Sequence, residues 1–344
     1  MRSSSGLKGA GIGAGYFAQF QHEAWTRIPE VEIVAVADRS EVKAREVALK
    51  YAIPHHYSDW RRMIDLERPD FVDIVTPPDS HEEICSYAAE RGINIICQKP
   101  LAPDFAISQK IVANATAAGV RFMVHENWRW QPWYRKLKEI GDTGVIGEFT
   151  HLQFLTRLGD GWGDNPYSPR QPFFRDYPQL LIYETGVHFI DTFRFLLGEV
   201  NSVFAQLQRL NPLIRGEDAG VLFLSFKNGA TAVWDANRYN EVEAEDPRLT
   251  FGQLRIDGMH GHVTMDTESN IRLKMLGESG HNIAYERTRK NFAGDCVYFL
   301  QRHFVDCILS GAGFESSGDD YLKTVRIVEA AYESAKTSSV VTVD

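Results

Sequence analysis

Three groups of residues in this 344-residue chain have types and spacings that could carry chemistry: a lysine, a glutamate-histidine pair and a glycine-rich turn. Lys99 follows an apolar run that ends at Cys97, and Pro100 restrains its backbone. Ligands bind at the carboxyl edge of parallel sheets, so a lysine there is placed for binding or catalysis. Most lysines at strand ends are simply solvated, and Lys99 becomes a candidate only together with the other two groups.

The second group is Glu184 and His188, four residues apart at the expected start of an apolar helix that ends at Gly198. At this spacing both side chains lie on one helical face, so the carboxylate can orient the imidazole and stabilise its protonated form. Histidine suits the general base of an alcohol oxidation because its pKa lies near neutral pH. A lone histidine on a helix is more often structural, and both interpretations stay open.

The third group is the turn Gly13-Ala14-Gly15-Tyr16-Phe17-Ala18, which directly follows the first expected strand. Gly13 permits a tight turn, and Gly15 lets the backbone approach a pyrophosphate. Ala18 stands in the place of a third glycine and keeps helix and strand close. The pattern predicts a dinucleotide site in which Tyr16 and Phe17 belong to the binding turn.

Asp38 closes the second expected strand, where its carboxylate can accept hydrogen bonds from both ribose hydroxyls. Because an acidic residue would repel a 2'-phosphate, we predict NAD rather than NADP as the cofactor. The neighbouring Arg39 could partly neutralise that repulsion, although stacking on the adenine or plain solvation is the simpler interpretation.

Two further segments lie where expected strands end. The first is a proline-rich turn. The second carries charged groups beside an apolar strand, and a salt bridge between Glu126 and Arg129 is the alternative to a functional role for Glu126. These segments are Thr76-Pro77-Pro78-Asp79-Ser80-His81 and His125-Glu126-Asn127-Trp128-Arg129-Trp130.

The elements that must position these residues differ between the two parts of the chain. Residues 1–126 alternate short apolar runs with helical patterns, which predicts a doubly wound parallel sheet. Residues 127–344 carry longer alternating segments and the turn dipeptides Asn228-Gly229 and Asp257-Gly258, which predict an α+β domain with a mostly antiparallel sheet. The expected strands are 7–12, 31–37, 71–75, 93–97, 120–124, 148–156, 202–208, 220–226, 231–235, 249–256 and 340–343.

Composition excludes several classes of partner. The net charge of -9, with no run of Lys or Arg, opposes binding to nucleic acid or anionic lipid. No apolar run approaches the ~20 residues of a membrane span, and no leader-like stretch precedes the first strand. The four cysteines lack metal or redox spacing. We therefore expect a cytoplasmic, soluble protein without a metal site.

Taken together, these motifs resemble the glucose-fructose oxidoreductase/inositol dehydrogenase (Gfo/Idh/MocA) family over essentially the whole chain. The resemblance implies a Rossmann domain joined to a C-terminal domain with an open sheet, assembly as a homodimer or homotetramer, and NAD(P)-dependent oxidation of a sugar or polyol hydroxyl. It also implies that Lys99 contacts the reacting hydroxyl, that His188 takes its proton and that Glu184 holds His188. Asn127 and Arg129 would border the nicotinamide and the substrate.

Two positions depart from the family pattern. The residue before the lysine is usually glutamate, and here it is Gln98, so we expect Lys99 to have a lower pKa than in relatives because a negative neighbour is missing. The acid of the histidine pair is usually aspartate, and Glu184 adds a methylene, which changes its reach.

Within the family, Gln98-Lys99-Pro100 and the segment around Trp128 are similar to aldose dehydrogenases of the D-apiose type. Trp128 and Trp162 suit the apolar face of a sugar ring, with Arg129, Arg157 and Asp160 as hydroxyl partners. The expected reaction is oxidation of an anomeric hydroxyl to a lactone. An inositol or polyol dehydrogenase, a non-catalytic NAD-binding regulator and an NAD-dependent glycoside hydrolase are the alternatives.

Overall fold

The computed structural model describes residues 6–343, which form two compact units. The first comprises the chain up to Asn127 together with Val297–Lys323. The second comprises Trp128–Cys296 together with the chain from Thr324 onward. The chain therefore leaves the first unit once, returns to it, and ends in the second.

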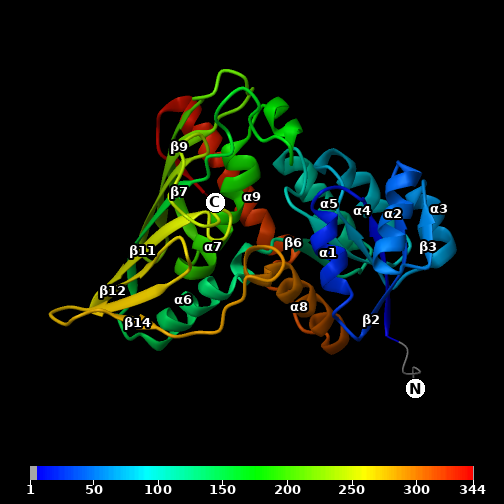
Figure 1. The fold of residues 1–344 in the computed structure, drawn as a ribbon, viewed down its shortest axis with the longest axis horizontal. Helices are drawn as coiled ribbons and strands as arrows, with labels where there is room; N and C mark the ends of the chain where they lie inside the picture. The colour runs from blue at the N-terminus through cyan, green and yellow to red at the C-terminus, as the bar shows by residue number, and fades with distance from the viewer. Residues whose placement is uncertain (1–5, 344) are drawn as a thin grey trace. The chain divides into compact units, whose positions relative to one another are not determined.

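Within the described residues, the first unit contains a six-stranded sheet in the order β3-β2-β1-β4-β5-β6, drawn in blue to cyan in Figure 1. All neighbouring strands are parallel. The strand order reverses between β1 and β4, as in doubly wound folds, whose ligands bind at such a point. The strands are β1 (Leu7–Ile12), β2 (Val31–Ala37), β3 (His55–Tyr57), β4 (Phe71–Ile74), β5 (Asn94–Gln98) and β6 (Phe122–His125).

Several helices of the first unit begin at side-chain caps that the sequence supplies. Ser40, Asp59 and Asp104 each accept a hydrogen bond from a backbone N–H in the first turn of the following helix. Such caps satisfy amide groups that have no partner within the helix. The helices are α1 (Ala18–Trp25), α2 (Glu41–Tyr51), α3 (Trp60–Glu67), α4 (His81–Ala89), α5 (Phe105–Ala117) and α8 (Cys296–Ser310), with the short turn η1 (Pro78–Ser80).

The returning segment is part of the core of the first unit. Phe304 of α8 packs against Phe71 of β4, with ring centroids 5.2 Å apart. The guanidinium of Arg121 donates to the carbonyl oxygens of Cys307 and Ala312. Apolar burial and these hydrogen bonds therefore both hold this segment to the parallel sheet.

In the part of the chain that the structure describes, the second unit has a nine-stranded sheet in the order β14-β13-β12-β11-β7-β10-β9-β8-β15. It is antiparallel except where β10 pairs with β7. Side chains alternate between buried and more exposed positions along its central strands, as in a sheet packed on one face. Figure 1 shows α6, α7 and α9 along one face, and Phe189 of α7 stacks on Trp234 of β10 with centroids 5.0 Å apart.

The bounds of the second unit's elements complete the fold. Its strands are β7 (Phe149–Arg157), β8 (Val200–Gln208), β9 (Ala219–Phe226), β10 (Thr231–Asn237), β11 (Gly252–Gly258), β12 (Gly261–Met265), β13 (Ile271–Met275), β14 (His281–Ile283) and β15 (Val341–Thr342). Its helices are α6 (Pro132–Thr143), α7 (Val187–Leu197) and α9 (Gly318–Thr337), which starts in the first unit, with η2 (Trp128–Trp130), η3 (Pro172–Asp176), the π-helix η4 (Leu181–Gly186) and η5 (Ala293–Asp295).

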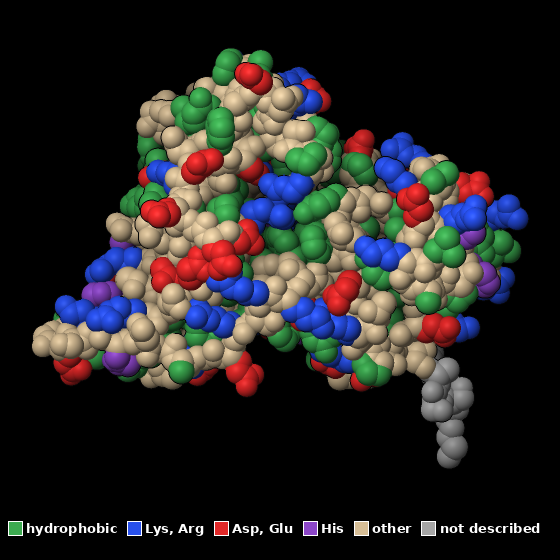
Figure 2. Space-filling view, viewed as in Figure 1, with side chains coloured by type: hydrophobic (Ala, Val, Ile, Leu, Met, Phe, Trp, Pro, Cys, Tyr) green, Lys and Arg blue, Asp and Glu red, His purple; other side chains and the backbone are tan. Residues whose placement is uncertain are grey.

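The predicted fold class is confirmed, and one predicted turn is wrong. Asn228-Gly229 connects β9 to β10 as predicted. Asp257-Gly258 instead ends β11, and the chain turns at Met259-His260, because Gly258 still pairs with Gly261 of β12. On the face shown in Figure 2, basic and acidic side chains are interspersed and form no continuous basic surface.

Candidate active site

Most residues predicted to bind the cofactor lie at one edge of the first sheet. Carboxyl ends of parallel strands meet at the same edge, so residues that follow different strands come together there. In the structure, Gly13–Phe17 follows β1, Asp38 and Arg39 follow β2, Thr76 and Pro77 follow β4, Gln98 and Lys99 stand at the end of β5, and Asn127 follows β6.

The glycine-rich turn has a shape that suits a pyrophosphate. Gly13 has a φ of +110°, and a Cβ there would lie 2.5 Å from the carbonyl oxygen of Val75. A Cβ on Gly15 would meet no atom within 4 Å, so the turn borders open space. α1 begins beyond it at Ala18 without a side-chain cap. A ligand can approach the backbone closely at Gly15, and the positive end of the α1 dipole favours an anion there, so the turn fits a dinucleotide.

Asp38 ties the first two strand ends together. One carboxylate oxygen accepts a hydrogen bond from the N–H of Ala14 at 2.9 Å, and the other accepts from the N–H of Ser40 at 2.8 Å. These bonds hold the carboxylate beside the glycine-rich turn, where the sequence predicts a ribose. Arg39 next to it is exposed.

His81 links two loops at this edge. Its ring nitrogens lie 2.9 Å from the carbonyl oxygen of Leu101 and 2.8 Å from that of Thr76. The ring is wholly buried, and burial lowers the pKa of His81, although these two carbonyls oppose the shift. Its contribution to a cofactor site would therefore be to hold the loops that follow β4 and β5.

Three polar side chains stand near the ends of β5 and β6. Gln98 is buried and accepts a hydrogen bond from the N–H of Lys99 at 2.8 Å, whereas Lys99 itself is half-buried. Asn127 is buried, and its Nδ2 donor has no hydrogen-bond partner among residues 6–343. A buried amide donor of this kind fits a polar ligand group.

In the second unit, the segment that carries Glu184 is a π-helix rather than the predicted start of an α-helix. η4 covers Leu181–Gly186, and α7 with His188 begins only at Val187. Gly186 lies against the sheet, because a Cβ there would be 2.8 Å from the ring of Trp234. Single π-helical turns occur often at functional sites.

Arg238, which the sequence analysis missed, holds two of the predicted substrate residues. It donates to both carboxylate oxygens of Asp160, at 3.1 and 2.7 Å, and to Glu184 at 3.0 Å and the Thr185 hydroxyl at 2.9 Å. Burial lowers the pKa of Arg238, but the carboxylates of Asp160 and Glu184 outweigh it and raise that pKa. Its position directly after β10 was the available signal.

The rings of Trp128 and His188 are stacked, with centroids 4.5 Å apart and an angle of 22° between the planes. Next to them, the guanidinium of Arg129 forms two hydrogen bonds with Asp191 of α7, at 2.8 and 2.6 Å. Both partners of this ion pair are buried. The segment after β6 is therefore fixed to the helix that carries His188.

The remaining predicted substrate residues have partners of their own. Arg157 donates to the backbone carbonyl of Thr156 and to Asp235, whereas Trp162 is 54% exposed and donates to Glu241. The structure thus brings Asp160 and Glu184 to one guanidinium and gives Arg157 and Trp162 separate partners.

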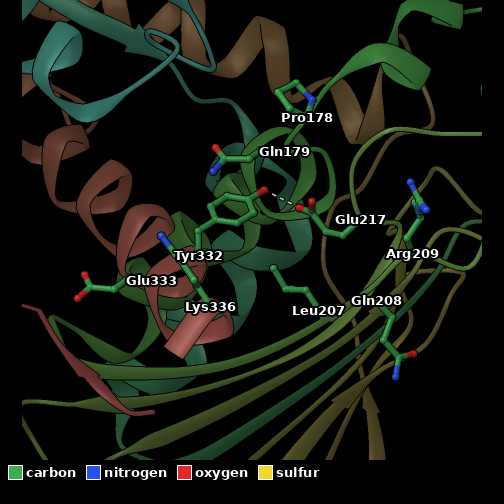
Figure 3. A pocket seen from close by; sticks show the side chains of 9 residues that line it. All are labelled: Pro178, Gln179, Leu207, Gln208, Arg209, Glu217, Tyr332, Glu333 and Lys336. Atoms are coloured by element: carbon green, nitrogen blue, oxygen red, sulfur yellow. Dashed lines mark hydrogen bonds between the residues drawn. The ribbon is translucent and has the colours of Figure 1, made fainter. Parts of the chain in front are cut away.

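A cavity of about 550 Å³ lies beside the start of η4, and Figure 3 shows Tyr332 and Glu217 pointing toward each other within it. Glu217 accepts hydrogen bonds from the N–H groups of Leu180 and Ile182 at 3.2 Å and from the Tyr332 hydroxyl at 2.5 Å. The Tyr332 oxygen accepts from the N–H of Tyr183 at 3.1 Å. Burial raises the pKa of both side chains. Together they cap the amide groups at the start of the π-helix.

Comparison with known proteins decides the family. Residues 7–126 match GFO_IDH_MocA, an oxidoreductase family with an NAD-binding Rossmann fold, and residues 134–264 match the C-terminal domain of the same family. The chain belongs to the GFO/IDH/MocA family. The predicted NAD-binding Rossmann domain and NAD cofactor are confirmed, as is the assignment to an oxidoreductase family.

Members of the GFO/IDH/MocA family align with nearly all of this chain. A D-apiose dehydrogenase of Rhizobium rhizogenes is 33% identical over 338 residues, which cover 96% of this chain and 95% of that protein. One of Paraburkholderia graminis is 32% identical, covering 96% and 88%. A myo-inositol 2-dehydrogenase of Thermotoga maritima is 25% identical, covering 94% of each. The family relatives are thus dehydrogenases of sugars and inositols.

Similar solved structures confirm the fold. An oxidoreductase from Agrobacterium radiobacter in complex with NAD+, L-tartaric acid and magnesium has a TM-score of 0.89 and 31% identity, covering 98% of both chains. A levoglucosan dehydrogenase with NADH and levoglucosan has a TM-score of 0.87 and 23% identity, covering 98% of this chain and 99% of that one. No helix within residues 6–343 has the length and apolar character needed to cross a membrane.

Proposed function

We propose that this protein is an NAD-dependent dehydrogenase that oxidises the anomeric hydroxyl of an aldose similar to D-apiose to a lactone. The observation that carries the proposal is the similarity to two D-apiose dehydrogenases over 96% of the chain. In this proposal residues 1–126 bind NAD, and residues 127–344 bind the sugar and form the interface of a cytoplasmic homodimer or homotetramer.

The proposed chemistry assigns roles to three side chains. NAD, when bound, supplies the acceptor for the hydride that leaves the carbinol carbon. Lys99 donates a hydrogen bond to the reacting oxygen, and its charge stabilises the negative charge that develops there. His188 accepts the hydroxyl proton as general base. Glu184 holds His188 and stabilises its protonated form.

Further side chains have proposed roles in binding the sugar or the cofactor. The buried Trp128 ring stacks on the His188 imidazole and would fix its plane, so its proposed role is to orient the general base. The cofactor would be held by Gly13, Gly15, Tyr16, Phe17, Asp38, Arg39, Thr76, Pro77, His81, Gln98, Lys99 and Asn127. The sugar hydroxyls would be bound by Arg129 and Asp160, and Arg157 and Trp162 stay candidates for its more distant atoms.

A substrate panel tests the proposed reaction. The purified protein is mixed with NAD and with D-apiose, other aldoses, inositols or linear polyols, and NADH formation is followed. We expect D-apiose or a related aldose to have the highest kcat/KM. Activity with cyclitols alone would support an inositol dehydrogenase instead. NAD binding without any NADH formation would support a regulator or, where a glycoside is cleaved, a hydrolase.

Two variants test the assigned roles. Lys99→Ala should lose most turnover while the NAD affinity from fluorescence titration stays near wild type, and Lys110→Ala on the exposed surface of α5 is the matched control. His188→Ala should lower kcat by ~10²- to 10⁴-fold, the scale of acid-base catalysis. Loss of NAD affinity with turnover intact in Lys99→Ala would contradict its role.

A further inference from the structure

A chain of hydrogen bonds runs from a buried carboxylate to the backbone of Lys99. Asp73 of β4 accepts from Gln21 Nε2 at 2.9 Å, and its other oxygen accepts from Trp25 Nε1 at 2.7 Å. Gln21 in turn accepts from Gln98 Nε2 at 3.4 Å, and Gln98 Oε1 accepts from the N–H of Lys99 at 2.8 Å. Asp73, Gln21 and Gln98 are all buried, so water competes little for the bonds among them, whereas the bond to the Lys99 N–H is partly buried.

Both ends of this chain fix its direction. The N–H of Lys99 can only donate a hydrogen bond, whereas an ionised carboxylate can only accept. Each residue between them must therefore accept on the side of Lys99 and donate on the side of Asp73. The amides of Gln21 and Gln98 do both, and every link then has one donor and one acceptor.

A glutamate at position 98 would break this pattern. Its carboxylate would still accept from the N–H of Lys99, but it would present a second acceptor to Gln21. Gln21 would then lie between two carboxylates with only one side of its amide able to donate. One buried acceptor would face another, which is costly where no water can enter.

We propose that Asp73, Gln21 and Gln98 form a positioning chain that holds the backbone of Lys99 at the sheet edge, and that position 98 requires an amide rather than a carboxylate because the chain ends in a buried aspartate. The three act through Lys99 in this proposal, so they are positioning residues. The proposal rests on the proposed function only for the consequence of displacing Lys99, and the chain itself can be tested without substrate.

Reversal of the chain is the decisive test. In the Gln98→Glu variant, the new carboxylate faces the amide oxygen of Gln21, and two acceptors cannot form a hydrogen bond. When Asp73→Asn is added, the new amide can donate to Gln21, and Gln21 can donate to the new glutamate, while Trp25 still finds an acceptor. The direction of the middle links is then reversed, and every link again has one donor and one acceptor.

The first readouts are taken without NAD, at alkaline pH where Asp73 is ionised. Gln98→Glu should lower the melting temperature and speed hydrogen exchange of the Lys99 amide, and the double variant should restore both. Gln301→Glu, the same change at another buried glutamine of the first unit, is the control. It should lower the melting temperature, leave exchange at Lys99 unchanged and gain nothing from Asp73→Asn.

Turnover provides a second readout. Gln98→Glu should lower kcat by about 10- to 100-fold, the scale of a small displacement of a catalytic group, and the double variant should recover to within about threefold of wild type. If Gln98→Glu does not fold, recovery of folded protein by adding Asp73→Asn supports the same conclusion.

Different results would overturn the positioning chain and the proposed dehydrogenase function. If the effects of the two substitutions on Lys99 exchange simply add, or the double variant is worse than either single variant, the positioning chain is wrong. If compensation is seen in exchange while all variants keep wild-type kcat, Lys99 is held but its position does not matter, and the positioning role is wrong. If wild type forms no NADH with any sugar or polyol, the proposed function fails, whereas the exchange data still test the chain.

Discussion

His22 of α1 is a buried titratable group beneath the glycine-rich turn, and its pKa makes the stability of the first unit depend on pH. A Cβ on Gly11 would lie 2.6 Å from the His22 ring, and the Tyr51 ring packs on the other side with centroids 5.5 Å apart. Burial lowers the pKa of His22 to about 4, and the backbone of Gly13 only partly opposes this shift. The folded protein therefore keeps His22 neutral in mild acid.

The sign and size of the effect follow from proton binding. In the unfolded chain His22 has a pKa near 6.5, so below that pH the unfolded state binds a proton that the folded state does not, and the free energy of unfolding falls. The difference of roughly 2.5 units corresponds to about 3.4 kcal/mol, of which about 2 kcal/mol is lost by about pH 5. Asp73 acts in the opposite sense. Burial raises its pKa to about 7, so stability rises as pH falls from about 7 toward 4.

Urea unfolding of wild type, His22→Gln and Asp73→Asn at about pH 7.5 and about pH 5 separates the two groups. When the pH falls from about 7.5 to about 5, we expect the free energy of unfolding of His22→Gln to rise by about 2 kcal/mol relative to that of wild type, because the variant lacks the histidine that stays unprotonated in the folded state. For Asp73→Asn, the free energy of unfolding should fall by about 2 kcal/mol relative to that of wild type over the same pH change. Parallel changes of wild type and His22→Gln would show that His22 is not held neutral in the folded protein.

Three further predictions concern the second unit and the cofactor. Arg238→Gln should lower the free energy of unfolding by about 2–3 kcal/mol in thermal or urea unfolding, because the partly buried carboxylates of Glu184 and Asp160 lose a buried cation, although Arg170 still pairs with Asp160. It should also lower kcat through Glu184, whereas Arg194→Gln, a buried arginine with other partners, should affect stability alone. Tyr332→Phe should cost about 1–3 kcal/mol of stability by removing the hydrogen bonds that its hydroxyl makes with the Tyr183 N–H and with Glu217. Asp38→Ala should weaken NAD binding in fluorescence titration by about 1–3 kcal/mol, and unchanged affinity would contradict the ribose contact.

The parallel sheet and the glycine-rich turn could be predicted because their signals are local. β1 and β2 have the bounds that the apolar runs of the sequence indicate, and Gly13 occupies a conformation that the motif requires. The three-residue strand β3 was missed because His55–Tyr57 carries no apolar pattern, and its pairing with β2 supplies what the segment itself lacks.

The second unit shows where local patterns fail. The spacing of Glu184 and His188 indicates one helical face only if the backbone is α-helical throughout, and the π-helix interrupts that geometry. The bonds that cap η4 come from Glu217 and Tyr332, and those that hold its end come from Arg238. These partners are distant in sequence, and no periodicity connects them with the segment that they hold.

Gln98 shows the same limit at a single position. The sequence marks it as a departure from the family and suggests a reason within its immediate neighbourhood, the charge on Lys99. The structure supplies a reason of longer range, because the side chain donates toward Gln21 and, through it, toward Asp73. In the proposed positioning chain, the amide of Gln98 serves the direction of the hydrogen bonds rather than the charge of its neighbour. Departures from a family motif are therefore best interpreted together with the buried polar groups to which they connect.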